Sequence, residues 1–205
     1  MMEDDTLNLS GQLTSDGPAL ISFLQAMPEI DLSPLNDLRV TGGVNGDIAL
    51  SLPLANPEAL QLEINARPSF PEVVYQPLDL SLQSVEGDLA WLQDGESSGL
   101  VGEASGQLLG GSINADIDTQ RNNIQLQGSV ATKALFGLTG LDSQGRMPLE
   151  GPLEWQGSVA LTPTPTLRLE SRLVGLTSHL PEPFAKSPQQ VWPWTLTADM
   201  DTKHV

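Results

Sequence analysis

Residues 45–52 read NGDIALSL, in which Ile48, Leu50 and Leu52 alternate with small or polar side chains. Side chains of a β-strand point alternately to its two faces, so this stretch predicts a strand with one apolar face and one polar face. Similar alternation recurs at 60–64, 78–83, 113–118, 124–130, 153–161, 167–170 and 194–200. Such alternation is typical of antiparallel sheets that keep one face in water. We therefore expect an all-β, mainly antiparallel fold.

Glycine-containing steps separate the predicted strands, in TGGVNGD, VEGDLAW, LLGGSIN and LQGSV. Steps of this kind are typical of turns and bulges. A loose repeat also links the segments NGDIALSL, EGDLAWLQ, GGSINADI and QGSVALTP, in which glycine is followed by alternation. This repeat favours stacked β-units over one closed barrel.

One or two short helices are expected between the strands. Residues 16–27 place Asp16 where it can cap a helix and Pro18 in the first turn. Residues 132–140 form a second candidate, which ends near a glycine. We treat residues 1–205 as a single repeating segment of a larger protein. A joint is expected near residues 66–77, where three prolines occur, because proline cannot donate to a strand ladder.

The charge balance limits the classes of partner. The chain has 26 acidic and 9 basic side chains, which gives a net charge of -17. Such a surface repels nucleic acid, so we expect no nucleic-acid partner. The hydrophobic fraction of 39% is enough for a folded domain. The absence of cysteine excludes disulfides, thiolate metal sites and a cysteine nucleophile.

A catalytic site is hard to assemble from this sequence. His179 and His204 are the only histidines, and neither a Gly-x-Ser-x-Gly nor a His-Glu-x-x-His motif occurs. Residues 106–112, GQLLGGS, lack the lysine of a phosphate-binding loop, and we interpret them as a hairpin turn. Asp116 and Asp118 are too few to hold calcium. We expect no enzymatic activity and no cofactor.

The apolar faces of the strands must be covered in one of two ways. They can pack on a second layer, which gives a β-solenoid or sandwich module that acts as a spacer or protein-interaction scaffold. Alternatively, the sheet forms a trough that leaves its apolar face for a ligand. A buried methylene contributes about 0.8 kcal/mol, so an acyl chain of roughly 16 carbons could gain on the order of 10 kcal/mol before entropy costs. The alternation alone leaves both alternatives open.

Residues 167–194, LRLESRLVGLTSHLPEPFAKSPQQVWPW, resemble the YhdP family of AsmA-like proteins. The shared pattern has a Ser-x-Leu-x-Gly-Leu step, a Leu-Pro-x-Pro-x-x-Lys segment and a Trp/Pro-rich start to the next strand. Its residues here are Ser171, Leu173, Gly175, Leu176, Leu180, Pro181, Pro183, Lys186, Trp192 and Pro193. Residues 40–54, 78–95 and 102–117 are similar to further strands and turns of the family.

The resemblance implies a curved, U-shaped β-groove sheet with an apolar interior. The parent protein would be anchored in the inner membrane of a Gram-negative bacterium and project into the periplasm. It would act as a bridge that moves phospholipids between the inner and outer membranes. Its partners would be phospholipid acyl chains and adjacent segments of the parent chain. Exposed sheet edges would also allow a homodimer.

The resemblance assigns the groove lining to alternating apolar positions. These are Ile48, Leu50, Leu52, Leu62, Ile64, Leu80, Leu82, Ile113, Ile117, Ile124, Leu126, Val159 and Leu169. Residues 171–190 are expected to be a joint between successive groove strands, because Pro181 and Pro183 prevent strand pairing. We expect Lys186 to be solvated, with contact to a lipid phosphate as the alternative.

Overall fold

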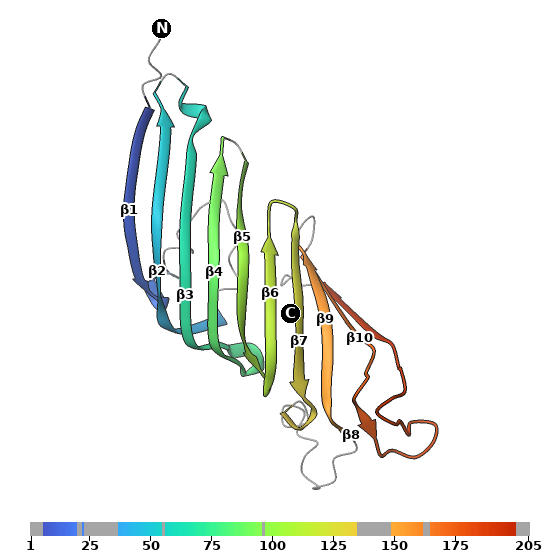
Figure 1. Ribbon diagram of the computed structural model, residues 1–205. Helices are drawn as coiled ribbons and strands as arrows, with labels where there is room; N and C mark the ends of the chain where they lie inside the picture. The colour runs from blue at the N-terminus through green and yellow to red at the C-terminus, as the bar shows by residue number, and fades with distance from the viewer. Residues whose placement is uncertain are drawn as a thin grey trace. The chain divides into compact units, whose positions relative to one another are not determined.

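The computed structural model describes residues 6–19, 22, 37–54, 56–95, 97–134, 149–161 and 165–199. Most of the described residues lie in strands (Figure 1). They are β1 (Thr6–Asp16), β2 (Leu38–Pro53), β3 (Gln61–Tyr75), β4 (Leu80–Asp94), β5 (Ser97–Leu108), β6 (Gly111–Asp118), β7 (Asn123–Ala131), β8 (Leu149–Glu150), β9 (Pro152–Ala160), β10 (Thr166–Ser171), β11 (Thr177–Ser178) and β12 (Trp194–Asp199). Two short 3-10 helices are η2 (Pro57–Ala59) and η3 (Gln76–Leu78).

The strands form one large sheet and one small one. Ten strands follow the order β1-β2-β3-β4-β5-β6-β7-β9-β10-β12, and β11 pairs with β8. The registers of β1 with β2, β2 with β3, β3 with β4, β7 with β9, β9 with β10 and β10 with β12 are all antiparallel. Strands β1 and β12 stand at the two ends of the order, so the described strands do not close a barrel. The prediction of an all-β, mainly antiparallel fold is confirmed.

The chain divides into two compact units. The first comprises residues 1–105 and 116–123, and the second comprises residues 106–115 and 124–205. Strands β1 to β4 lie side by side in the first unit (Figure 1). The joint expected at residues 66–77 falls inside this unit, where β3 and η3 occupy those residues. The organisation of the chain as a single repeating segment stays a prediction.

Both predicted helices begin where the sequence places them. Residues 17–19 and 22 are helical, and the amide nitrogen of Ala19 donates to Asp16 Oδ1 at 2.7 Å. Asp16 is therefore an N-cap that satisfies an amide without an intrahelical partner. Residues 132–134 are helical as well. The other residues of the two predicted helices, 20–21, 23–27 and 135–140, lie outside the described residues.

The loose sequence repeat follows the strand order. Its four copies fall on β2, β4, β6 and β9, which occupy every second place in the large sheet, and the copy on β6 begins one residue earlier, at Gly110. Each copy contains a glycine at which a Cβ atom would meet a backbone carbonyl oxygen of the next strand. The four pairs are Gly46 with Asn65, Gly87 with Glu103, Gly111 with Ser129 and Gly157 with Arg168. The repeat therefore marks a pair of strands, and its glycine permits a close approach between them.

A tight turn joins β5 to β6. Leu109 and Gly110 both have positive φ, at 51° and 74°. Positive φ at both central residues is the signature of a type I′ turn, whose twist matches that of the flanking strands. The interpretation of residues 106–112 as a hairpin turn is confirmed.

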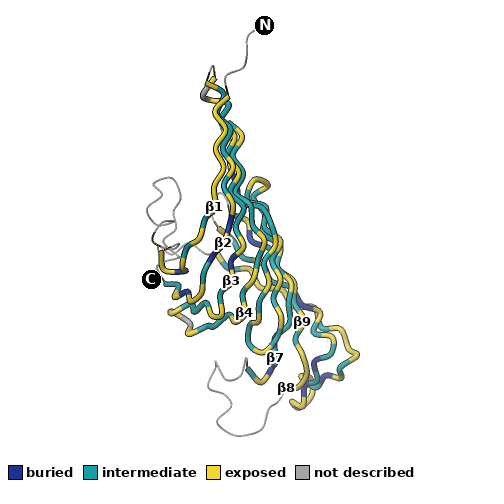
Figure 2. The backbone as a smooth tube through the Cα atoms, turned by 60° about the vertical axis from the view of Figure 1, so that its left-hand side comes forward, coloured by how far each residue is buried: buried dark blue, intermediate teal, exposed yellow. Residues whose placement is uncertain are grey.

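Buried side chains are few (Figure 2). The buried hydrophobic residues are Val40 and Val44 in the first unit and Val130, Val159 and Leu176 in the second. Among the described residues, no side chain is less than 2% exposed. Most apolar side chains in the described part of the chain therefore keep part of their surface accessible.

Candidate lipid-binding face

The register of the first unit places several predicted lining residues together. Ile48 lies directly opposite Ile64, and Leu50 lies opposite Leu62. Directly opposed residues of an antiparallel pair share one face of the sheet. The row extends to β1, where Leu9 lies opposite Leu50. We define the first apolar face by Leu7, Leu9, Leu13, Val44, Ile48, Leu50, Leu52, Leu62, Ile64, Ala66, Leu89 and Trp91, which follow from the registers of β1 to β4.

Leu80 and Leu82 lie on this same face, although their spacing from Leu89 along β4 is irregular. Leu82 lies opposite Val73, and Val73 lies opposite Val40 on β2. Val40 is an even number of positions from Ile48, so it extends the same face of β2. In sequence, however, Leu82 and Leu89 are an odd number of positions apart, which would place them on opposite faces of a regular strand.

A β-bulge explains how Leu82 and Leu89 share a face despite this odd spacing. The register of β2 with β3 shifts between Thr41 and Gly43, where two residues of β3 oppose a single residue of β2. Gly42 on β2 and Ser84 on β4 both have positive φ, at 108° and 51°. An extra residue in a strand reverses the faces of all residues beyond it. The bulge therefore keeps Leu80 and Leu82 on the face that carries Leu89.

A second apolar face lies within the second unit. Ile124 opposes Val159, and Val159 opposes Leu167. Gly157 lies between Leu126 and Leu169, which both oppose it. We define the second apolar face by Ile124, Leu126, Val130, Leu153, Trp155, Val159, Leu167, Leu169 and Leu196. Ile113 and Ile117 are four residues apart on β6, so they share one side of that strand.

The predicted lining residues are covered only in part. Val159 is buried, and the other twelve of the thirteen predicted positions are half-buried. Neighbouring strands alone provide much of this cover. Leu9 on the edge strand β1 is 55% exposed, whereas its opposed partner Leu50 on an interior strand is half-buried. The only other sheet among the described residues is the two-stranded pair of β8 and β11.

Two tryptophans belong to these faces and were not among the predicted lining residues. Trp91 lies opposite Ile64 in the first unit. Trp155 lies opposite Gly128 in the second unit, and a Cβ on Gly128 would be 3.0 Å from the indole ring. An aromatic ring over a cross-strand glycine is a known way to stabilise a sheet. The alternation in the sequence contains both residues, so it was the signal that could have found them.

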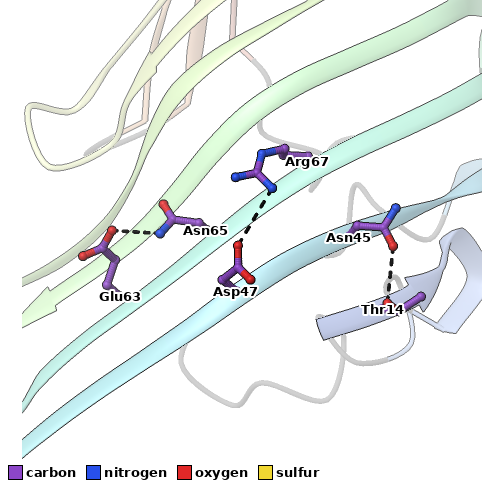
Figure 3. Close-up of polar contacts among 6 residues, drawn as sticks. All are labelled: Thr14, Asn45, Asp47, Glu63, Asn65 and Arg67. Carbon is purple, nitrogen blue, oxygen red and sulfur yellow. Dashed lines mark hydrogen bonds and ion pairs between the residues drawn. The ribbon is translucent and has the colours of Figure 1, made fainter. Parts of the chain in front are cut away.

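The opposite face of the first unit is polar. Thr14 Oγ1 lies 3.3 Å from Asn45 Oδ1, and Asn65 Nδ2 donates to Glu63 Oε1 at 2.8 Å (Figure 3). Arg67 pairs with Asp47 at 3.8 Å, and both side chains are more than half exposed, so this ion pair adds little stability.

A shallow, open hollow lies mainly on this polar face. It has a volume of about 370 Å³ and is lined by Ser10, Gly11, Gln12, Asp47, Ile48, Ala49, Glu63 and Asn65. No group of three metal-ligating His, Cys, Asp or Glu side chains occurs within the described ranges. The hollow therefore has the chemistry of a hydrated polar surface.

Residues 172–193 connect β10 to β12, which pair with each other in the sheet. The expectation that these residues lie between successive strands is confirmed. Strand pairing was not expected in this segment, but some occurs. Thr177 and Ser178 form β11, and Ser178 also forms a β-bridge with Lys186. His179 Nε2 lies 3.4 Å from Glu150 Oε2, and both side chains are more than half exposed.

Lys186 contradicts its predicted environment. Its side chain was expected in solvent, but the residue is only 3% exposed. Its Nζ atom donates to the carbonyl oxygens of Leu176 at 2.7 Å and Ser187 at 3.1 Å. A buried ammonium group requires such acceptors, because desolvation without them is costly. The prediction of a solvated lysine is therefore wrong, because the ammonium group binds backbone carbonyl oxygens within the loop.

Comparison with known families identifies the family of the chain. None of the helices described here is long and apolar enough to cross a bilayer. Neither the curated proteins nor the solved structures contain a match to the chain. A family model described as YhdP protein matches residues 1–204. The chain therefore belongs to the YhdP family.

Proposed function

We propose that this chain is the lipid-binding segment of a bridge-like protein that moves phospholipids between the inner and outer membranes. Acyl chains would lie on the apolar faces, which would form the interior of a curved, U-shaped groove. Membership of the YhdP family is consistent with a role in lipid transfer. The parent protein would be anchored in the inner membrane, and this segment would lie in the periplasm next to adjacent segments of the same chain.

The partial exposure of an uncharged apolar face is the observation that supports this proposal best. The positions of β1 to β4, β7, β9, β10 and β12 that share a side with the two apolar faces carry no Asp, Glu, Lys or Arg. Half-buried leucine and isoleucine side chains lose further apolar surface when an acyl chain covers them. Each methylene transferred from water contributes about 0.8 kcal/mol. A site of this kind needs no specific polar group, which fits the lack of a metal-binding cluster among the described residues.

Neighbouring residues of β2 offer a matched test. Leu50 is on the apolar face, and Ala49 is exposed on the polar face. We expect lipid to be recovered from the purified chain by extraction and mass spectrometry, and a fluorescent fatty acid to bind. Leu50→Glu should reduce binding at least about tenfold, because a carboxylate would be desolvated beneath the acyl chain. Ala49→Glu should leave binding unchanged.

Folding must be measured in the same variants. Leu9→Glu is useful here because Leu9 is exposed on an edge strand and belongs to the same face. Circular dichroism should show that Leu9→Glu keeps its strand content while it binds less fatty acid. A wild-type chain that carries no lipid and binds no fatty acid would contradict the proposal. Unfolding of every apolar-face variant, with no lipid bound to the wild type, would instead favour a structural spacer module.

A further inference from the structure

A short hairpin projects from the segment between β10 and β12. Ser178 and Lys186 exchange two backbone hydrogen bonds, at 2.9 Å and 3.2 Å. The amide nitrogen of Phe184 donates to the carbonyl oxygen of Pro181 at 2.9 Å, which closes the turn. We call residues 180–184, Leu-Pro-Glu-Pro-Phe, the hairpin tip. All five of its residues are exposed.

The base of the hairpin is fixed by buried groups. The Nζ atom of Lys186 binds the carbonyl oxygens of Leu176 and Ser187, and Leu176 is itself only 3% exposed. The amide nitrogen of Gly175 donates to the carbonyl oxygen of Pro188 at 2.8 Å. These contacts tie both sides of the segment together below the tip. The hairpin tip is therefore held in solvent by an ordered base.

Two of the five exposed side chains of the tip, Leu180 and Phe184, are large and apolar, and one, Glu182, is acidic. Phe184 is 61% exposed and Leu180 is 40% exposed. Six of the nine exposed large hydrophobic residues in the described chain occur between residues 174 and 196: Val174, Leu180, Phe184, Val191, Trp194 and Leu196. Large apolar side chains that are held exposed by an ordered base are candidates for contact with a protein or a membrane.

The charge of this region differs from that of the rest of the chain. Residues 165–199 contain three acidic residues, Glu170, Glu182 and Asp199, and three basic residues, Arg168, Arg172 and Lys186. The net charge of -17 therefore lies entirely outside residues 165–199. An anionic lipid surface repels acidic protein, and the repulsion is felt within about a Debye length, roughly 8–10 Å. Residues 165–199, which carry no net charge, are repelled less by such a surface than the acidic chain as a whole.

We propose that the hairpin tip inserts Leu180 and Phe184 shallowly into the interfacial layer of a phospholipid bilayer. Two side chains are far too few for a stable protein interface, which buries roughly 1,200–2,000 Å². Shallow insertion requires only a few apolar groups near a surface that does not repel the protein. The proposal rests on the proposed function, because a bridge-like protein that moves lipid between two membranes must contact a bilayer where lipid enters or leaves it.

Vesicle flotation tests this proposal directly. The full chain would be mixed with vesicles of phosphatidylethanolamine containing a minor share of phosphatidylglycerol. The double variant Leu180→Ser with Phe184→Ser should bind at least about tenfold more weakly than the wild type. Leu54→Ser is the matched control, because Leu54 is 56% exposed and lies far along the chain in the first unit. This control should bind as the wild type does.

Two results would overturn the proposal. One is equal binding of the wild type and the double variant. The other is a wild type that stays off the vesicles, which would leave the tip as a contact for another protein. Because both substitutions are in exposed positions, thermal unfolding should confirm that the double variant remains folded.

Fatty-acid binding without vesicles separates this proposal from the proposed function. The double variant should bind a soluble fluorescent fatty acid normally, whereas Leu50→Glu should not. If the wild type binds vesicles through its tip but binds no fatty acid, the lipid-carrying function fails and the membrane contact remains. If fatty acid binds and the tip variant floats normally, the membrane contact alone fails.

Discussion

A Cβ atom on Gly46 would overlap the carbonyl oxygen of Asn65 on the neighbouring strand. Glycine is therefore required at this position by the close approach of β2 and β3. Three further copies of the sequence repeat have a glycine against the next strand in the same way. The repeat thus records a local backbone geometry as well as an alternation of side chains.

Gly46→Ala should destabilise the chain by about 1–3 kcal/mol, because the added methyl group must displace backbone of an adjacent strand. Gly11→Ala is the control. Gly11 lies on β1 opposite Ile48 of β2, and a Cβ atom added at Gly11 would have no other atom within 4 Å. This control should be neutral or slightly stabilising. Urea denaturation of both variants would measure the difference. Equal stability of the two variants would show that β2 and β3 are far enough apart at Gly46 in solution to admit a methyl group.

Ser84 provides a test of the bulge. Its φ of 51° lies in the left-handed region, where a β-branched side chain is strained. Ser84→Val should therefore cost about 1–2 kcal/mol, while Ser84→Gly should cost much less. Ser105→Val on β5 is a control, because Ser105 is exposed, lies in a strand and has no positive φ. If Ser84→Val and Ser105→Val unfold at the same temperature, the bulge does not constrain Ser84.

The alternation of apolar residues was sufficient to predict β2, β3, β4, β6, β7, β9, β10 and β12, because one solvated face leaves a strong period of two in the sequence. The same rule could not connect Leu82 to Leu89. Their odd spacing is explained only by the bulge, which depends on the register of β2 with β3. Register is a long-range property, so the faces of individual residues cannot be assigned from local alternation alone.

Lys186 shows a different limit. Its neighbours along the chain, Phe184 and Ala185 before it and Ser187 and Pro188 after it, form no alternating pattern that would indicate burial. One of its two acceptors, the carbonyl oxygen of Leu176, lies ten residues away in sequence. The environment of this lysine is set by how the loop closes on itself. Composition predicts solvent exposure for a lysine, and here tertiary structure overrides it.

Lys186→Met should destabilise the loop between β10 and β12. The substitution removes the ammonium donor from the buried carbonyl oxygen of Leu176 and the part-buried one of Ser187, at a cost of about 1–3 kcal/mol. Lys133→Met is the matched control, because Lys133 is exposed and should tolerate the change within about 0.5 kcal/mol. Amide hydrogen exchange would locate the effect, with faster exchange expected at Gly175 and Ser178. Unchanged exchange at both amides would contradict a structural role for the buried ammonium group.

The tryptophans of the apolar faces can report where an acyl chain lies. Trp91 and Trp155 belong to the two faces, whereas Trp192 lies in the loop and its amide nitrogen donates to the carbonyl oxygen of Arg172 at 3.0 Å. In chains that retain only one tryptophan, the others being replaced by Phe, a fatty acid with a spin label on its acyl chain should quench Trp91 and Trp155 strongly. Trp192 should be quenched much less, because it lies on neither apolar face. Stronger quenching of Trp192 than of the other two would place the acyl chain at the loop, and the apolar faces would then have to be abandoned as its binding surface.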